Sequence, residues 1–365
     1  MLIGHITAAL EQFAPPQLQE EYDNCGLIIG SPAGECTGVL ISVDVTPAVV
    51  KEAIDSGCNL IVAHHPLLFK GIKRLNGLTP VEQSIKLLLR NDIAVYACHT
   101  CLDNAEHGVS HMMAEKLGLQ AVKVLDPKQG SLTALSVYTP AESANELLLS
   151  LIDAGAGHIG NYDSCSFAVK GTATFRPLEG ADPYSGEIGY QHTGEEIRLD
   201  MVLPSYLRNS VEKALLQVHP YEEPAYQFTP MLNGSRHTGL GTVGNLPKAM
   251  SPVELVEKVK NTFGSPVARC TTYPADSIIR RVALCGGSGA SLIPKAIAAG
   301  AQAKVTSDTR YHDFVDYADT ILIIDIGHHE SENCTKDIFY HIITKKFPNF
   351  AVRYANTDTN PINYL

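Results

Sequence analysis

The chain has 365 residues, of which 45% are hydrophobic and 18% are charged, as is typical of a folded globular protein. This length exceeds one ordinary core and predicts two or more domains. Asp and Glu outnumber Lys and Arg by 39 to 28, and the resulting net charge of −11 argues against a broad nucleic-acid footprint. We find no membrane-length apolar run, no signal-peptide pattern and no paired framework among the 9 cysteines, so we expect a cytoplasmic protein without a membrane partner.

Residues 1–127 alternate between helical and strand patterns. Helices are predicted at 3–13, 47–55, 79–90 and 109–117, and strands at 38–45, 59–63 and 93–98. Thr46 and Pro47 are good N-cap and first-turn residues for the second helix. This alternating order predicts a mainly parallel sheet with helices on its faces, that is, an α/β fold.

The same alternation returns in residues 233–365. Strands are predicted at 281–284, 303–306 and 320–324, and helices at 291–299, 311–318 and about 331–345. We therefore expect 1–127 and 233–365 to form one discontinuous α/β domain built from two similar halves.

Residues 128–232 follow a different pattern. Strands are predicted at 134–138, 164–169, 172–175 and 197–202, and helices at 143–153 and 207–218. Strands on either side of two helices predict an α+β ferredoxin-like domain. An insertion in a surface loop is tolerated because the core of the host domain is left intact.

Histidine and carboxylate side chains follow three of the predicted strands, at 59–63, 93–98 and 321–326. They are His64, His65, Asp103, His328 and Glu332. Ligands gather at the carboxyl ends of strands in open α/β sheets, so we expect one face of the sheet to collect all five. A single histidine of this kind is more often a hydrogen-bonded surface or core residue, but three similar loops favour a metal site.

Imidazole nitrogen and carboxylate oxygen suit zinc, manganese or iron. Five ligands exceed the need of one tetrahedral ion, and a bridging carboxylate would let two ions share them. His328 and Glu332 are four residues apart, so they share a face if the segment is helical. His99 is either a sixth ligand or a partner that holds a ligand, and we prefer the second role.

Asp308 and His312 follow another predicted strand, and neither has an evident packing role. We predict that they are catalytic residues that orient the substrate or move protons. The glycine-rich segment 285–289 could cradle an anion, although a tight turn explains it equally well.

For two further motifs we favour a structural role over a functional one. The pair Cys98 and Cys101 has the spacing of a redox or zinc motif, but buried small hydrophobic residues explain it better. The segment 219–223, His-Pro-Tyr-Glu-Glu, could bind a metal, but a structural role at a strand edge is the stronger interpretation.

Several motifs together resemble the Ngg-interacting-factor-like family, whose members are also named GTP cyclohydrolase 1 type 2 homologs. The motifs span nearly the whole chain and are 22–27, 63–69, 99–103, 286–289, and 327–328 with 331–332. The insert is similar to the PII and CutA signalling fold found in longer bacterial members, through 155–162, 171–180 and 219–223. Tyr22, Cys101 and Ser307 stand where the family usually has Trp, Asn and Gly, which affects the cleft and not the ligands.

The resemblance implies a dinuclear metal site at the five residues named above, with two divalent ions per chain, zinc before manganese or iron. It also implies a toroidal homohexamer whose sites face an inner cavity. The leading hypothesis is a metal-dependent hydrolase acting on a nucleotide or another small phosphoester. The alternative is a non-enzymatic hexameric assembly that stores or delivers metal ions or serves as a protein scaffold.

Overall fold

A computed structural model of the chain describes residues 1–274 and 276–364. The chain divides into two compact units, Met1–Pro127 with His237–Leu365, and Lys128–Arg236. The second boundary lies at 236, whereas the sequence placed it at 232. Both positions fall in the connection between strands β9 (Tyr226–Pro230) and β10 (Gly239–Met250). None of the helices in the described part of the chain combines the length and the apolar character needed to cross a membrane.

The first unit contains a five-stranded sheet in the order β1-β4-β3-β2-β15. Its strands are β1 (Gly26–Ile29), β2 (Val39–Ser42), β3 (Leu60–Ala63), β4 (Ala94–Ala97) and β15 (Val352–Tyr354). All neighbours are parallel except β1, which runs antiparallel to β4. Every residue of β2, β3 and β4 is buried, as expected for parallel strands covered on both faces.

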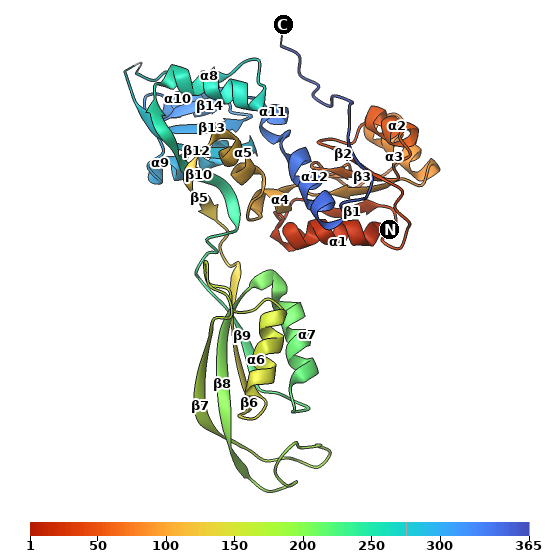
Figure 1. Cartoon of the computed structure of the whole chain (residues 1–365), viewed down its shortest axis with the longest axis vertical. Coiled ribbons are helices and arrows are strands. Elements are labelled where there is room, and N and C mark those ends of the chain that lie inside the picture. The colour runs from red at the N-terminus through yellow and green to blue at the C-terminus, as the bar shows by residue number, and fades with distance from the viewer. Residues whose placement is uncertain (275, 365) are drawn as a thin grey trace. The chain divides into compact units, whose positions relative to one another are not determined.

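Helices cover this sheet (Figure 1). Side chains of α2 (Pro47–Asp55) and α3 (Pro80–Arg90) share one hydrophobic cluster with the sheet. The helices α1 (Ile3–Phe13) and α12 (Thr335–Lys346) contact each other, and α12 contacts β2. Helix α2 begins as the sequence predicted, because the Thr46 hydroxyl accepts a hydrogen bond from the Val49 amide and Pro47 occupies the first turn.

A second, six-stranded sheet lies in the same unit, in the order β11-β14-β13-β12-β10-β5. Its other strands are β5 (Gln120–Pro127), β11 (Arg269–Cys270), β12 (Ile279–Ser288), β13 (Ala303–Ser307) and β14 (Leu322–Asp325). Only β12, β13 and β14 are parallel to one another. The associated helices are α5 (Val109–Leu117), α8 (Pro252–Phe263), α9 (Ile293–Ala298) and α10 (Tyr311–Tyr317).

The prediction of an α/β fold with parallel strands is confirmed in part, but the expectation of a single mainly parallel sheet was wrong. The unit has two sheets, and the second gains antiparallel strands at both edges. Strand β5 leads to the insert and β10 returns from it, so the chain reverses direction and the two strands pair antiparallel, with Pro127 opposite Gly239. In addition, α5 and β5 belong to the second sheet although they precede the insert.

The unit of residues 128–236 has the element order β-α-β-β-α-β, which is the ferredoxin-like order. Its elements are β6 (Leu132–Pro140), α6 (Ala144–Asp153), β7 (Ser166–Phe175), β8 (His192–Pro204), α7 (Arg208–Val218) and β9. The sheet is antiparallel in the order β7-β8-β6-β9, and α6 and α7 lie along it (Figure 1). Side chains of both helices pack with the sheet in one core. The two strands predicted at 164–169 and 172–175 are the single strand β7, because Gly171 stays in register opposite Glu196.

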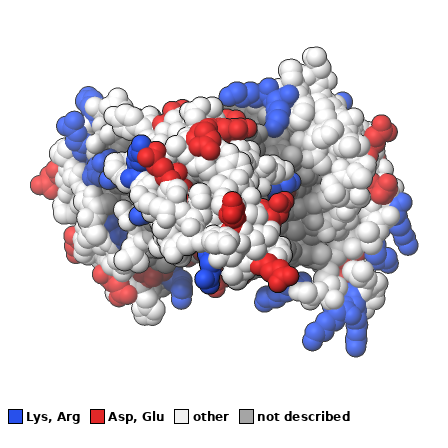
Figure 2. Space-filling view, turned by 90° about the horizontal axis from the view of Figure 1, so that it is seen from below, with Lys and Arg blue, Asp and Glu red and all other residues white. Residues whose placement is uncertain are grey.

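Short helices complete the chain. Two α-helices, α4 (Thr100–Asn104) and α11 (His328–Glu332), follow β4 and β14, and 3-10 turns lie at Pro16–Leu18, Ser205–Leu207 and Ala290–Leu292. The helix predicted at about 331–345 begins earlier and is interrupted between α11 and α12. On the face shown in Figure 2, acidic and basic side chains are interspersed and do not form one field of a single sign.

Candidate metal centre

The five side chains predicted as metal ligands come from three strand ends. His64 and His65 directly follow β3, and Asp103 lies on α4 after β4. His328 and Glu332 are the first and last residues of α11, which follows β14. Because β3 and β4 belong to the first sheet and β14 to the second, the group forms between two sheets, not on one face of a single sheet as the sequence analysis expected.

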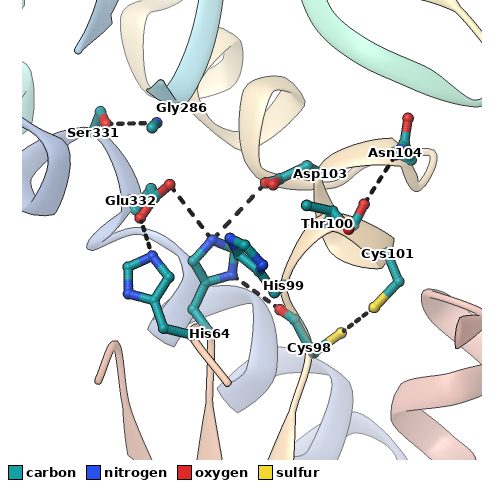
Figure 3. Close-up of polar contacts among 12 residues, drawn as sticks. His64, Cys98, His99, Thr100, Cys101, Asp103, Asn104, Gly286, Ser331 and Glu332 are labelled. Carbon is teal, nitrogen blue, oxygen red and sulfur yellow. Dashed lines mark hydrogen bonds and ion pairs between the residues drawn. The ribbon is translucent and has the colours of Figure 1, made fainter. Parts of the chain in front are cut away.

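The side-chain atoms of these residues converge on Glu332. One oxygen of its carboxylate lies 3.0 Å from Nε2 of both His65 and His328. Its other oxygen lies 3.7 Å from Nε2 of His64, which is also 4.0 Å from Oδ1 of Asp103 (Figure 3). The structure thus brings all five predicted residues together.

Each histidine of the group is held by its other ring nitrogen. Nδ1 of His64 lies 2.9 Å from the Cys98 carbonyl oxygen, and Nδ1 of His65 lies 2.8 Å from Oδ1 of Asp44. Nδ1 of His328 lies 2.7 Å from Oδ2 of Asp308. A carbonyl or carboxylate oxygen only accepts, so Nδ1 carries the proton in each ring. This arrangement aims Nε2 of every ring at the centre of the group, as in carboxylate–histidine–metal triads.

His64 shows that the group is suited to a cation. Its ring is fully buried, and Nε2 has no hydrogen-bond partner within the described residues. Carboxylate oxygens of Glu332 and Asp103 lie 3.7 and 4.0 Å from this nitrogen, beyond hydrogen-bond distance. A buried polar atom without a hydrogen bond is unfavourable, and a cation between Nε2 and the two carboxylates would satisfy all three groups.

The pKa values of the group show the same excess of negative charge. Burial raises the pKa of Asp103 to about 7. Burial would lower the pKa of His65 and His328, but their carboxylate partners raise it to about 10 and about 9. Burial opposes the charge on Glu332, yet the histidines, His64 first, hold its pKa well below the usual value. In the metal-free protein, protons on His65 and His328 therefore supply the positive charge that a bound cation would supply.

Helix α11 lies close to the backbone of Gly287, and this contact fixes the position of Glu332. Gly287 has a φ of +61°, and a Cβ atom at this position would lie 2.2 Å from Oε1 of Glu332. Its amide donates to the Ser331 hydroxyl at 2.9 Å, and the Gly289 amide donates to the Thr306 hydroxyl at 3.0 Å. These amides of segment 285–289 are committed to protein partners, which favours the tight-turn interpretation over the anion cradle.

His99 lies beside the group, and its role as a sixth ligand or as a supporting partner stays a prediction. Its ring packs 5.2 Å from His64 and 5.3 Å from His65, measured between centroids, and one ligand atom of each ring lies within 4.8 Å of the others. Nδ1 of His99 lies 2.9 Å from Oδ1 of Asp23. The second oxygen of Asp23 accepts from the Thr100 amide and hydroxyl. Burial would raise the pKa of Asp23, but its hydrogen bonds with the His99 ring and the Thr100 hydroxyl lower it.

The carboxylates behind the rings were only partly found from the sequence. Asp44 follows β2, which ends at Ser42, but the strand predicted at 38–45 includes Asp44, so the rule that pointed to the three strand ends did not select it. Asp308 was predicted as a catalytic residue, and here it contacts His328, so it acts through that ring. His312 is exposed on α10, where its ring contacts that of Tyr311. The catalytic roles of Asp308 and His312 stay predictions.

The cysteine pair and the segment 219–223 make contacts within the protein. The sulfur atoms of Cys98 and Cys101 are buried and lie 3.5 Å apart (Figure 3). A hydrogen bond with Cys101 lowers the pKa of the Cys98 thiol, but burial leaves that pKa above the usual value. A contact with Cys25 lowers the pKa of the Cys101 thiol, but the contact with Cys98 and burial raise it above the usual value. His219 contacts the Tyr138 carbonyl oxygen through Nε2 and accepts from the Tyr221 amide through Nδ1. Both ring nitrogens of His219 therefore have partners within its own unit.

Comparison with known proteins identifies the family. A Bacillus subtilis protein named GTP cyclohydrolase 1 type 2 homolog is 37% identical over 366 residues, covering 99% of this chain and 98% of the relative. A protein of the same name from Halalkalibacterium halodurans is 38% identical, covering 97% and 96%. The crystal structure of a Bacillus cereus protein related to NIF3 has a TM-score of 0.87 at 35% identity and covers 100% of this chain and 99% of that one. A family model described as Duf34/NIF3 (NGG1p interacting factor 3) matches residues 1–361, and the chain therefore belongs to this family.

Proposed function

We propose that the protein binds two divalent metal ions and hydrolyses a small phosphoester with them. The ligands are His64, His65, Asp103, His328 and Glu332. The main support is the buried Nε2 of His64, which faces two carboxylates without a donor between them. Zinc is the first choice for this nitrogen and oxygen donor set, followed by manganese or iron.

The chain's own groups would prepare the site for this chemistry. Two bound ions would polarise a substrate oxygen and lower the pKa of a water molecule. Asp44 and Asp308 fix the orientation of the rings of His65 and His328, so little reorganisation is needed when a ligand binds. Glu332 contributes a negative charge at the centre of the group, where it can be shared.

The substrate class follows from two considerations. The named relatives are called GTP cyclohydrolase homologs, which suggests a purine nucleotide as substrate. Hydrolysis of a phosphoester is a common use of a two-metal site. A nucleotide satisfies both, and we therefore propose a nucleotide or a related small phosphoester.

The test begins with metal content. Protein prepared without chelator should contain about two divalent ions per chain by mass spectrometry, the expectation for a two-metal site. The double variant His65→Ala with Glu332→Ala should lose them and remain folded, since the hydrophobic cores do not involve these side chains. A matched control combines His341→Ala with Glu257→Ala, two exposed positions. Full metal occupancy in the site variant would show that the ions bind elsewhere.

Turnover is tested separately on GTP and a panel of phosphoesters. We expect hydrolysis that requires metal and is lost in the site variant. Asp308→Ala and His312→Ala test the two predicted catalytic residues and are assayed with enough metal to saturate the site in both variants. A wild-type protein that holds two ions but leaves the whole panel intact would favour the alternative, a metal-storing or metal-delivering assembly or a protein scaffold.

We further propose that the chain forms a homohexamer and that residues 128–236 are a PII/CutA-like domain. The ferredoxin-like element order of this unit supports the second proposal. Light scattering on the purified protein should give six times the mass of one chain, 39.4 kDa. A monomeric mass would refute the hexamer.

A further inference from the structure

A row of aromatic rings leads from the candidate metal centre to the protein surface. The ring of His65 lies 5.3 Å from that of His99, and the ring of Phe69 lies edge-on to His99 at 5.6 Å. Phe69 in turn stacks on Tyr22, with ring centroids 6.4 Å apart and planes inclined by 26°. Tyr22 is 66% exposed and Phe69 is 46% exposed. The outer two rings of the row thus offer aromatic surface to a ligand.

The loops that present these two rings are tied to the metal centre and to each other. Tyr22 directly precedes Asp23, which holds Nδ1 of His99. The next residue, Asn24, donates from its side chain to the carbonyl oxygen of Leu68 at 2.7 Å, and Leu68 directly precedes Phe69. Both rings are therefore anchored by contacts that also orient the centre, as a ligand subsite requires.

Packing within the chain does not account for this exposure. Leu67, two residues before Phe69, is buried, so the loop already has an apolar anchor. Exposed aromatic faces beside a polar site are suited to stacking with a planar ring, because such a contact buries apolar area on both sides.

The charge of the same loop indicates what the planar ring carries. Residues 66–79 contain Lys70, Lys73 and Arg74, all exposed, and no Asp or Glu. The loop of Phe69 is therefore basic, whereas the loop of Tyr22 carries Glu20, Glu21 and Asp23, so the positive charge lies on the Phe69 side of the two rings. Positive charge next to a stacking surface favours a ligand that is both planar and anionic.

We propose that Tyr22 and Phe69 form a stacking subsite that selects phosphoesters with a planar ring, such as a nucleotide, over aliphatic phosphoesters. This inference rests on the proposed hydrolase function and names the part of the substrate that the chain recognises. The two residues determine specificity and do not take part in the chemical step.

Binding can be measured directly, because the chain has no tryptophan. Tyr22→Trp introduces a single fluorophore at the proposed subsite of the metal-loaded, full-length protein. We expect GMP to quench its emission and ribose 5-phosphate, which has the phosphate but no base, to leave it unchanged. Tyr162→Trp is the matched control, since Tyr162 is 74% exposed in the other unit and its emission should respond to neither compound.

Specificity is measured by comparing kcat/KM for the same two compounds. Phe69→Leu retains apolar bulk but removes the ring, and it should reduce the preference for GMP over ribose 5-phosphate about tenfold, or about 1.4 kcal/mol. An unchanged preference, or equal quenching by both compounds, would overturn the proposal.

Two other outcomes are distinguishable. If Phe69→Leu alters the oligomeric mass and not the preference for the base, the two rings are a contact between copies of the chain and the proposal is wrong. GMP quenching without turnover would refute the hydrolase function and retain the subsite. Turnover without any preference for the base would retain the hydrolase and refute the subsite.

Discussion

Replacing Asp308 by Asn tests whether the carboxylates behind the histidine rings set the affinity for metal. Oδ2 of Asp308 lies 2.7 Å from Nδ1 of His328, and Asn keeps an accepting oxygen while removing the negative charge. The backbone of Asp308 has a φ of +55°, which Asn also tolerates, so the fold should be preserved. Loss of such a partner typically weakens metal binding 10- to 100-fold.

Because the Asp308 side chain is partly exposed, we expect the loss of metal affinity in this variant to lie near the lower end of that range. The Asp308 side chain is 51% exposed, so water already screens its charge, whereas the Asp44 side chain behind His65 is 36% exposed. We expect a weakening of about tenfold for Asp308→Asn and a larger one for Asp44→Asn. At a free zinc concentration 100 times the wild-type Kd, binding stabilises the fold by about 2.7 kcal/mol. A tenfold higher Kd leaves about 1.4 kcal/mol of this stabilisation.

The assay is thermal unfolding of metal-stripped protein with and without buffered zinc. The control is Asp316→Asn, an exposed carboxylate on α10. Without zinc, Asp316→Asn should unfold near the wild-type temperature, whereas Asp308→Asn loses its ion pair with His328, so each variant is compared with its own metal-free form. If Asp308→Asn gains as much stability from zinc as Asp316→Asn does, the idea that these carboxylates tune the centre is wrong.

Four further predictions follow from the same geometry. Asp103→Asn should lower turnover and weaken the binding of one ion. The metal-free variant should nevertheless be at least as stable as wild type at pH 8, because burial raises the pKa of Asp103 to about 7 and so opposes its charge at that pH. A large loss of stability would contradict this expectation. Metal uptake at pH 7.5 should release protons, and affinity should rise towards pH 10, because His65 and His328 have pKa values of about 10 and about 9 without metal; calorimetry in buffers of different ionisation enthalpy measures this release. For the same reason, the stability that the two imidazolium groups give the metal-free protein is complete below pH 6.5 and is lost as the pH rises through 9 to 10. Replacing residues 128–236 by a short linker should leave a folded, metal-binding protein by mass spectrometry and circular dichroism, because β5 and β10 already pair at Pro127 and Gly239; an unfolded product would show that the insert is needed.

The limits of a helix were predictable where the residues at its ends strongly favour starting or ending a helix. Helices α2 and α5 have the predicted limits, since Thr46 and Pro47 start the first and Gly118, with a φ of +76°, ends the second. Sheet membership was not predictable, because periodicity describes a segment and not its partner. The pairing of β5 with β10 joins segments separated by the whole insert, so no local pattern could indicate it.

The site was predictable to a similar degree. Histidines after buried parallel strands are unusual enough to be noticed, and the structure groups His64, His65 and His328. Their carboxylate partners are harder to detect, because Asp is common after strands and in loops. The role of Asp308 as the partner of a ring depends on an interatomic distance of 2.7 Å, which residue order does not reveal.

The wide separation of the grouped side chains along the chain has a consequence for biosynthesis. His64, His65 and Asp103 leave the ribosome early, but Glu332, on which they converge, is made only after the whole insert. At typical translation rates this delay is on the order of tens of seconds. During that time a nascent chain holds an incomplete set of ligands, while the insert can already fold as its own unit. Completion of the group is therefore a late event, and a prematurely terminated chain would contain His64 and His65 without the carboxylate that joins them to His328.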